Sequence, residues 1–404
     1  MSKSLFFFIS LVFAVNCWEL IILAPVLNDQ TIPVIAVMWA IMGIYWFRNR
    51  QGVLSLYNFN KYNIYLFWII IGFALSIVSA YIFWAQDLLT GSIVNRGLIW
   101  YLYIPLLLYI QPSEKELIKA ITYYAVAYVI VWVLQAVSPD PITTSLNDVI
   151  ATGRYNGELG ETDFGQPLVG FPLILILLYY KIQKFIVLPS ARNFIPVFLL
   201  LILFFLFQNR STLFFALTVF GYSIFKLRSR NKILLISNLL ALLIGAYIYT
   251  AYYWSALFQE TIEQINDPDY NRWKAFYFFV FNYSPHWVCN IIGNGFLSAN
   301  EQGGKFIQDM MDQGYYQYDN GILGFWSQYG IIPIIVLYTV IFKILFQKSY
   351  PFYVKAIAAH ILFVPIIFDF HTAETFIFIL IIYFLAYYEE ICKLSYRQIT
   401  KVKV

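Results

Sequence analysis

Residues 62–85 read YNIYLFWIIIGFALSIVSAYIFWA, a run of 24 residues without a charged side chain. A transmembrane helix needs about 20 predominantly apolar residues, so this run predicts a membrane span. The rest of the chain repeats the pattern, because 61% of its 404 residues are hydrophobic and 12% are charged, against about 25% charged in soluble domains. We therefore expect an all-α polytopic membrane protein in which residues 1–404 form a single integral membrane domain.

Twelve stretches of the chain have the length and composition of a span. They are roughly 5–27, 31–47, 62–85, 92–110, 117–137, 164–180, 188–208, 211–227, 233–253, 321–342, 355–368 and 375–388. Two longer segments, 138–163 and 254–320, separate some of them. The second contains two aromatic, apolar runs, Ala275–Tyr283 and Trp287–Phe296, which are too short to span. These runs predict short helices lying in the membrane interface.

The basic residues are sorted by side when both termini are placed in the cytoplasm. Twenty of the 26 Lys and Arg residues then fall in inner segments, as the positive-inside rule requires. The segments 138–163 and 254–320 become outer loops. The six basic residues left outside are Arg96, Arg154, Arg210, Arg272, Lys274 and Lys305.

The outer arginines are candidates for binding phosphate. A guanidinium offers a planar fork that grips phosphate through two hydrogen bonds, whereas a lysine suffices as a topology signal. Arg154, Arg210 and Arg272 are expected at outer membrane edges, where a lipid-linked pyrophosphate would lie. The alternative is that they snorkel or pair with acidic loop residues. Arg96 has the further alternative of capping its own span.

Two outer segments add polar groups next to a span. Tyr155 and Glu158 follow Arg154 in a loop that enters the sixth span through Gly and Pro residues. Such residues can leave backbone groups free for a ligand, or they can be an ordinary helix start. Asp319 and Asn320 stand at the start of the tenth span. Asp319 is either the N-cap of that helix or a base that accepts a proton from a sugar hydroxyl.

The remaining titratable residues give weaker signals. Asp369, His371 and Glu374 lie close together between the last two spans, but so short a loop does not favour a metal site. His360 is expected to pack between helices, and His286 is a weak catalytic candidate. No cysteine spacing indicates a metal. We expect no metal and no cofactor.

Four motifs, in this order, resemble the superfamily of O-antigen polymerases (Wzy-type) and O-antigen ligases. They cover about residues 150–340, while the earlier spans match only in topology. The motifs are Arg154 followed after ten residues by Gly165; Asn209-Arg210-Ser211-Thr212; Asn271-Arg272-Trp273 followed by Gly293-Asn294-Gly295; and Asp319-Asn320-Gly321 with Gly330.

The sequence departs from the family pattern in two places. Tyr283 stands where the Arg-to-Gly spacing of the first motif would place a glycine after Arg272, which puts the second such motif in doubt. Asp319 stands where the ligases carry a histidine, and this favours the polymerases.

The resemblance implies a GT-C-like membrane glycosyltransferase of the bacterial inner membrane, with about 12 spans and a large periplasmic loop. It implies undecaprenyl-pyrophosphate-linked glycans as donor and acceptor, membrane lipids and a chain-length regulator protein as partners, and no nucleic acid. Arg154, Arg210, Arg272 and Asp319 would be catalytic. Substrate-binding residues would be Arg96, Tyr155, Glu158, Lys274 and Asn320.

Two other functions remain open from the sequence. A ligase would transfer the glycan to lipid A core or to protein, and it differs from a polymerase in its acceptor. A polysaccharide-lipid transporter would be expected to carry polar residues deep within its spans, whereas here they concentrate at the outer edge. The sequence names neither the sugar nor the linkage.

Overall fold

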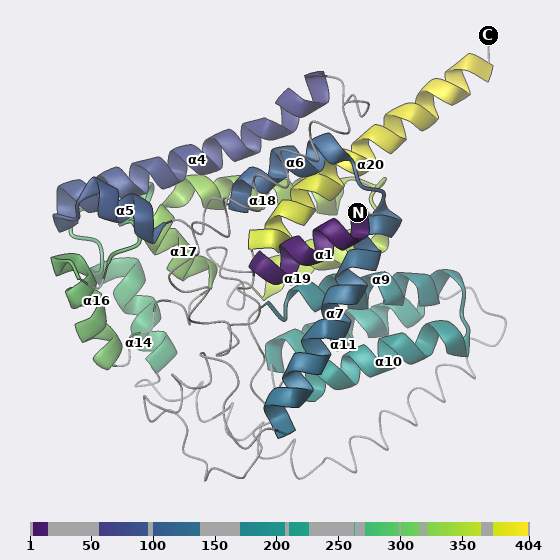
Figure 1. Cartoon of the computed structure of the whole chain (residues 1–404), viewed down its shortest axis with the longest axis horizontal. Coiled ribbons are helices and arrows are strands. Elements are labelled where there is room, and N and C mark those ends of the chain that lie inside the picture. Colours follow the sequence, from purple (N-terminus) through teal and green to yellow (C-terminus); the bar gives the residue numbers. More distant parts are fainter. Residues whose placement is uncertain are drawn as a thin grey trace.

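The computed structural model describes residues 3–14, 56–95, 100–137, 170–206, 210–225, 262, 271–298, 300–313, 315, 317, 321–364 and 375–402. All the regular structure in these ranges is helical, as expected. The first half contains α1 Lys3–Ala14, α4 Leu56–Trp84, α5 Leu88–Val94, α6 Tyr103–Ile110, α7 Glu114–Val137, α9 Leu173–Val187, α10 Ala191–Leu206 and α11 Arg210–Phe225. The second half contains α14 Asn271–Tyr277, the π-helix η3 Phe278–Asn282, α15 Trp287–Ile292, α16 Gln302–Asp312, α17 Ile322–Tyr329, α18 Ile331–Phe346, α19 Phe352–Phe363 and α20 Thr375–Val402 (Figure 1).

By length and composition, two of the described helices could cross a membrane. These are Lys61–Trp84 in α4 and Glu114–Gln135 in α7, with mean hydropathies of 2.3 and 1.9. Large apolar side chains are exposed along both, among them Trp68 and Ile82 on α4 and Ile130 on α7. Contiguous exposed apolar surface marks contact with a membrane or another protein, so these faces suggest membrane association.

Some span boundaries expected from the sequence are wrong. Residues 92–110 are not one helix, because α5 ends at Val94 and α6 begins only at Tyr103. Residues 321–342 are broken at Gly330, which separates α17 from α18. In the stretch expected as a span at 164–180, residues 170–172 form a turn and α9 begins at Leu173, while the helix expected over 355–368 ends at Phe363. The spans expected at 31–47 and 233–253 lie outside the described residues.

The core lies where helices distant in sequence cross. Leu173 to Tyr179 of α9 are all buried, and α9 packs on α7, α10, α11 and α19. His360 of α19 is fully buried there, hydrogen bonded to the Tyr179 hydroxyl and edge-on to Phe215, which confirms it as a packing residue. On the other side α4 packs closely on α18, since a Cβ at Gly72 would lie 2.7 Å from the Pro333 ring.

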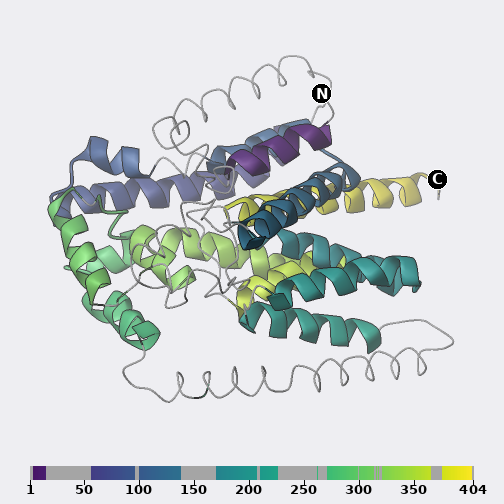
Figure 2. The same ribbon diagram turned by 60° about the horizontal axis from the view of Figure 1, so that its bottom comes forward.

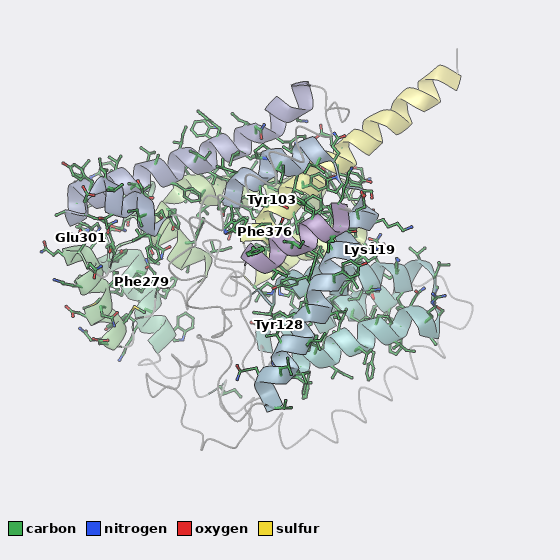
Figure 3. The ribbon with its side chains drawn as sticks, viewed as in Figure 1. Tyr103, Lys119, Tyr128, Phe279, Glu301 and Phe376 are labelled. Carbon is green, nitrogen blue, oxygen red and sulfur yellow. The ribbon has the colours of Figure 1, made fainter. Side chains whose placement is uncertain are left out.

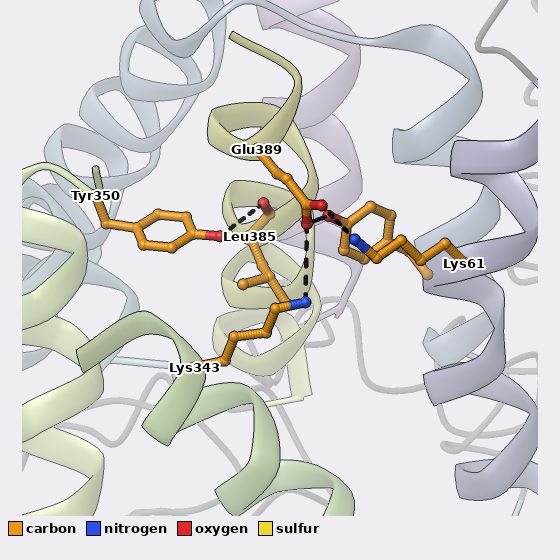
Figure 4. A network of polar contacts seen from close by, with 6 residues as sticks. Lys61, Lys343, Tyr350, Leu385 and Glu389 are labelled. Atoms are coloured by element: carbon orange, nitrogen blue, oxygen red, sulfur yellow. Dashed lines mark hydrogen bonds and ion pairs between the residues drawn. The ribbon is translucent and has the colours of Figure 1, made fainter. Parts of the chain in front are cut away.

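One end of the bundle, which we call the lysine end, carries an ion-pair cluster. The Glu389 carboxylate of α20 accepts hydrogen bonds from the Lys61 ammonium and the Tyr62 hydroxyl of α4, and Lys343 Nζ of α18 lies 3.7 Å away (Figure 4). Burial alone would raise the pKa of Glu389, but these hydrogen bonds and the Lys343 charge outweigh it and lower the pKa to about 2. The cluster therefore joins α4, α18 and α20 through one carboxylate.

Other hydrogen bonds gather further helix ends at the lysine end. α1 begins and α20 ends toward this side of the molecule (Figure 2). The bonds are Lys3 Nζ to Ile110 O, Tyr383 OH to Pro112 O, Tyr388 OH to Glu114, Tyr350 OH to Leu385 O and Tyr353 N to Gln183 Oε1.

Candidate functional site

The opposite end, which we call the glycine end, is where described residues of two sequence motifs meet, Gly293-Asn294-Gly295 and Gly330. In Figure 1 the far end of α4 lies beside α5, α16 and α17. Here the Trp84 indole donates to Asn294 Oδ1 at 3.0 Å, across 210 residues of sequence. The Gln86 side chain donates to Phe296 O and accepts from Ser298 N. These bonds fix residues 294–298 to the end of α4.

Asn294 is fully buried and uses its whole side-chain amide. Its nitrogen donates to Ser284 Oγ at 3.0 Å and to Ser327 O at 2.9 Å, while its oxygen accepts from Trp84. A buried amide with all of these groups paired holds its neighbours in one arrangement. Asn294 thus joins Ser284, α4 and α17.

Two glycines let the segment that follows α15 cross the backbone between α17 and α18. Gly293 has φ 85° and ψ 165°, and Gly330 has φ 76° and ψ −171°, a region that only glycine populates readily. A Cβ on Gly293 would lie 2.7 Å from Gly330 N, and one on Gly330 would lie 2.6 Å from Gly293 N. The crossing is closed by Asn294 N donating to Ser327 O and Gly295 N donating to Gln328 O. The glycines of two sequence motifs are therefore in direct backbone contact.

A second set of buried amides holds Gln317, which lies two residues before Asp319 in the sequence. Gln317 Nε2 donates to Ser327 Oγ, and its Oε1 accepts from Gln328 Nε2. Both glutamines are buried. Within the described residues Gln328 Oε1 has no hydrogen-bond partner, so it is a buried acceptor that can receive a donor. Gly324 leaves room for the Gln317 carbonyl, with which a Cβ there would collide.

Aromatic side chains join α14 and η3 to the same end. Phe279 and Tyr283 are buried against Trp84 and the helix α16, and η3 also packs on α17 (Figure 3). Trp84 and Tyr283 stack at 5.5 Å between ring centroids. This confirms the expectation of short helices within 254–320, separated at 283–286 and ended by Gly293.

The predicted site residues are described only in part. Arg96, Arg154, Tyr155, Glu158, Asp319 and Asn320 lie outside the described residues. Arg210 begins α11, which packs on α9, α10 and α19, and Arg272 lies in α14, in a different part of the molecule (Figure 1). The side chains of these two arginines are not among those described. Lys274 is half-buried, two residues after Arg272.

The geometry identifies the first residues of two helices and corrects the N-cap role considered for Asp319. The N-cap of α17 is Gly321, with φ 50° and no side-chain capping bond, so the N-cap role considered for Asp319 belongs to a glycine. His286 is the N-cap of α15, because its Nδ1 accepts from Val288 N at 3.2 Å while its ring stacks on Phe83. That contact gives His286 a structural role. Asp369, His371 and Glu374 lie outside the described residues.

Sequence reasoning missed Gln317, Gln328, Trp84 and Asn95. Asn95 is buried, accepts from the Tyr329 hydroxyl at 2.9 Å and ends α5, which is why a helix does not run through 92–110. One signal was present, because Gln328 is an amide inside an expected span, and polar groups at such positions need partners within the protein.

The described part of the glycine end is a scaffold. It fixes Gln317 and Gly321, the near neighbours of Asp319 and Asn320, through buried amides and close backbone packing. It also joins the helix that carries Arg272 to α17 through η3. Such a frame can hold a base and a cation in fixed places, which is what proton transfer and charge stabilisation need. No protein-family model matches the chain, and comparisons with curated proteins and with solved structures find no match.

Proposed function

We propose that the chain is a bacterial membrane glycosyltransferase that polymerises oligosaccharide repeat units linked to undecaprenyl pyrophosphate. The product is a surface polysaccharide made at the outer face of the inner membrane. The observation that carries the proposal is the glycine end, because the Gly293–Gly330 crossing and the Gln317–Gln328 pair fix the sequence neighbours of Asp319. Two of the four motifs that resemble the polymerases, Gly293-Asn294-Gly295 and Gly321 with Gly330, supply described residues to this place.

The chemistry follows from the leaving group. An acceptor hydroxyl attacks the anomeric carbon of the donor, and the bond from that carbon to the phosphate oxygen breaks with its electron pair. Asp319 takes the hydroxyl proton, with Glu158 as the reserve base. The departing pyrophosphate gathers negative charge, which Arg154 and Arg272 stabilise through cationic hydrogen bonds. Arg210, on α11 in a different part of the molecule, is left out of this step. Alignment of the two lipid-linked substrates supplies a further part of the rate.

The proposed topology has about 12 spans, both termini in the cytoplasm and the glycine end outside. It is supported by the lysine end, where Lys3, Lys61 and Lys343 gather with the end of the last span. It is also supported by the apolar faces of α4 and α7. A cysteine placed at Glu301, in the same lobe as Phe279 (Figure 3), should react with an impermeant reagent from outside. Labelling from the cytoplasmic side alone would reject this topology.

The activity is tested with the purified protein in lipid nanodiscs and a lipid-linked oligosaccharide. Wild type should convert it to a ladder of longer lipid-linked chains. Asp319→Asn should abolish the ladder and leave donor binding largely intact, because the shape stays and the proton acceptor is lost. Asp309→Asn, on the exposed face of α16, is the matched control and should be as active as wild type.

Two results would count against the proposal. A ladder of normal length from Asp319→Asn would remove Asp319 from the mechanism. Transfer to lipid A core, with no ladder, would identify a ligase instead.

A further inference from the structure

An aromatic stripe runs along the outer side of α14, η3 and α15. Its members are large apolar side chains with exposed fractions of 44% to 66%: Trp273, Tyr277, Phe281, Trp287 and Ile291. Tyr277 and Phe281 have ring centroids 5.9 Å apart, so the rings form one surface. Apolar surface of this extent marks contact with a membrane or another molecule.

The π-helix keeps this surface straight. Residues four apart on an α-helix drift by about 40°, because each residue turns about 100°. The stripe passes from Trp273 to Tyr277 within α14, and then from Tyr277, the N-cap of η3, to Phe281 inside η3. A π turn holds more residues than an α turn and so rotates less per residue, which offsets the drift. The three side chains therefore stay on one side.

The opposite side of the same helices is anchored to the protein. Ala275, Phe279 and Tyr283 are buried, and Cys289 of α15 is fully buried beside Ser79 of α4. The exposure of the stripe is thus a property of a packed element whose other face is already occupied.

Three observations indicate what covers the stripe. It begins where the exposed face of α4 ends, since Phe83 stacks on His286, the residue before Trp287. That face, with Tyr81 and Ile82 exposed, belongs to a helix long and apolar enough to cross a membrane. In Figures 1 and 2, α14 crosses the direction of α4, as a helix lying in the plane of a membrane surface would.

The residue types and charges of α14 and the stripe also indicate contact with a membrane surface. Trp and Tyr rings are enriched at the level of lipid headgroups, where one edge is apolar and the other wet. Arg272 and Lys274 flank Trp273 in the sequence of α14, and cations on such a helix complement headgroup phosphates.

We infer that the stripe of Trp273, Tyr277, Phe281, Trp287 and Ile291 is seated in the headgroup layer of the membrane and sets the depth of α14. Resting on the proposed function, this would hold the helix of Arg272 at the level of the pyrophosphate that joins glycan to lipid. The stripe then acts as a positioning element and does not touch the reacting atoms.

Nitroxide accessibility measures this depth without any substrate. Single labels are placed at Tyr277→Cys and Phe281→Cys on the stripe and at Asp309→Cys on the exposed face of α16. Cys17 and Cys392 are changed to serine, and the buried Cys289 is retained. The full chain is held in nanodiscs of phosphatidylethanolamine and phosphatidylglycerol. Collision rates are measured with oxygen, which concentrates in lipid, and with a water-soluble nickel chelate.

The stripe labels should show an oxygen-to-nickel ratio several-fold higher than the Asp309→Cys label. A ratio equal to that control would place the stripe in water and overturn the inference. Low collision rates with both reagents would mean that a protein surface covers the stripe, and would overturn it as well. If one stripe variant does not fold, Trp287→Cys reports on the same surface. If the stripe labels show the expected depth but the protein makes no polymer, the proposed function is wrong and the membrane position of the stripe is still supported.

Discussion

Gly330→Ala should separate the two backbones that cross at the glycine end. A Cβ there would collide with the Ile291 carbonyl oxygen and lie 2.6 Å from Gly293 N. All of these are backbone atoms of a packed loop, so none can rotate away as a flexible side chain would. The φ of 76° with ψ of −171° is strained for alanine even without the collision.

The expected loss of stability is the sum of the backbone strain and the weakened hydrogen bonds. Alanine in this region of φ and ψ costs about 1–3 kcal/mol. Pushing the backbones apart also weakens two hydrogen bonds, Asn294 N to Ser327 O at 3.0 Å and Gly295 N to Gln328 O at 2.8 Å, worth about 0.5–1.5 kcal/mol each. The expected loss is on the order of 4 kcal/mol, a large part of the roughly 5–15 kcal/mol of a typical domain.

Gly221→Ala is the matched control. Gly221 lies inside α11, and nothing lies within 4 Å of a Cβ built there. Alanine at such a position is neutral or stabilises a helix by about 0.5–1 kcal/mol. The two variants make the same chemical change, so their difference isolates the crossing.

Two measurements check the prediction. The melting temperature in detergent should fall in Gly330→Ala by several degrees relative to Gly221→Ala, at about 2 °C per kcal/mol. Alkylation of Cys289, which is fully buried close to the crossing, should be faster in Gly330→Ala, with Cys17 and Cys392 replaced by serine. Equal melting temperatures and equal alkylation rates in the two variants would refute the proposed tight crossing.

Three further predictions concern other contacts. Glu389 has a pKa lowered from 4.5 to about 2, so its stabilising effect is present above pH 4.5 and is lost as the pH falls toward 2. The melting temperature of wild type should drop across that window by the equivalent of about 1–2 kcal/mol, because the lysines are partly exposed, and that of Glu389→Gln should drop less. Asn294→Ala should cost about 1–3 kcal/mol by leaving the Trp84 indole unpaired, and Trp84→Phe should then destabilise the Asn294→Ala background less than it destabilises wild type. Arg154→Lys and Arg272→Lys should each lose about tenfold or more in polymer synthesis at normal expression; full activity in both would make these arginines structural.

Helix positions were largely predictable because apolar runs are a local signal. The run at 117–137 matches α7, and that at 62–85 matches the last 23 residues of α4 to within one residue. The breaks were not predictable from such runs. Asn95 ends α5 in partnership with Tyr329, 234 residues away, and the φ of Gly330 is required by its contact with Gly293.

The same reasoning explains what was missed at the site. Polar residues at a span edge were expected to meet a ligand, and Gly293, Asn294 and Gly330 were named only as parts of the motifs that carry the family resemblance. Their partners are amides such as Gln328, which look ordinary in sequence. Their importance comes from pairing within a buried space, and that pairing exists only once the chain has folded.

The ion pair at the lysine end joins two residues that are synthesised at very different times. Lys61 and Glu389 are separated by 328 positions in the chain, so synthesis at about 5–20 residues per second places them tens of seconds apart. In the proposed topology Lys61 is an unpaired cation while α4 inserts, and a positive charge at that moment helps to retain its end of the helix in the cytoplasm. The carboxylate arrives only after nearly the whole chain has emerged. The same ammonium group would thus first orient one helix during biogenesis and later fasten the last helix onto the finished bundle.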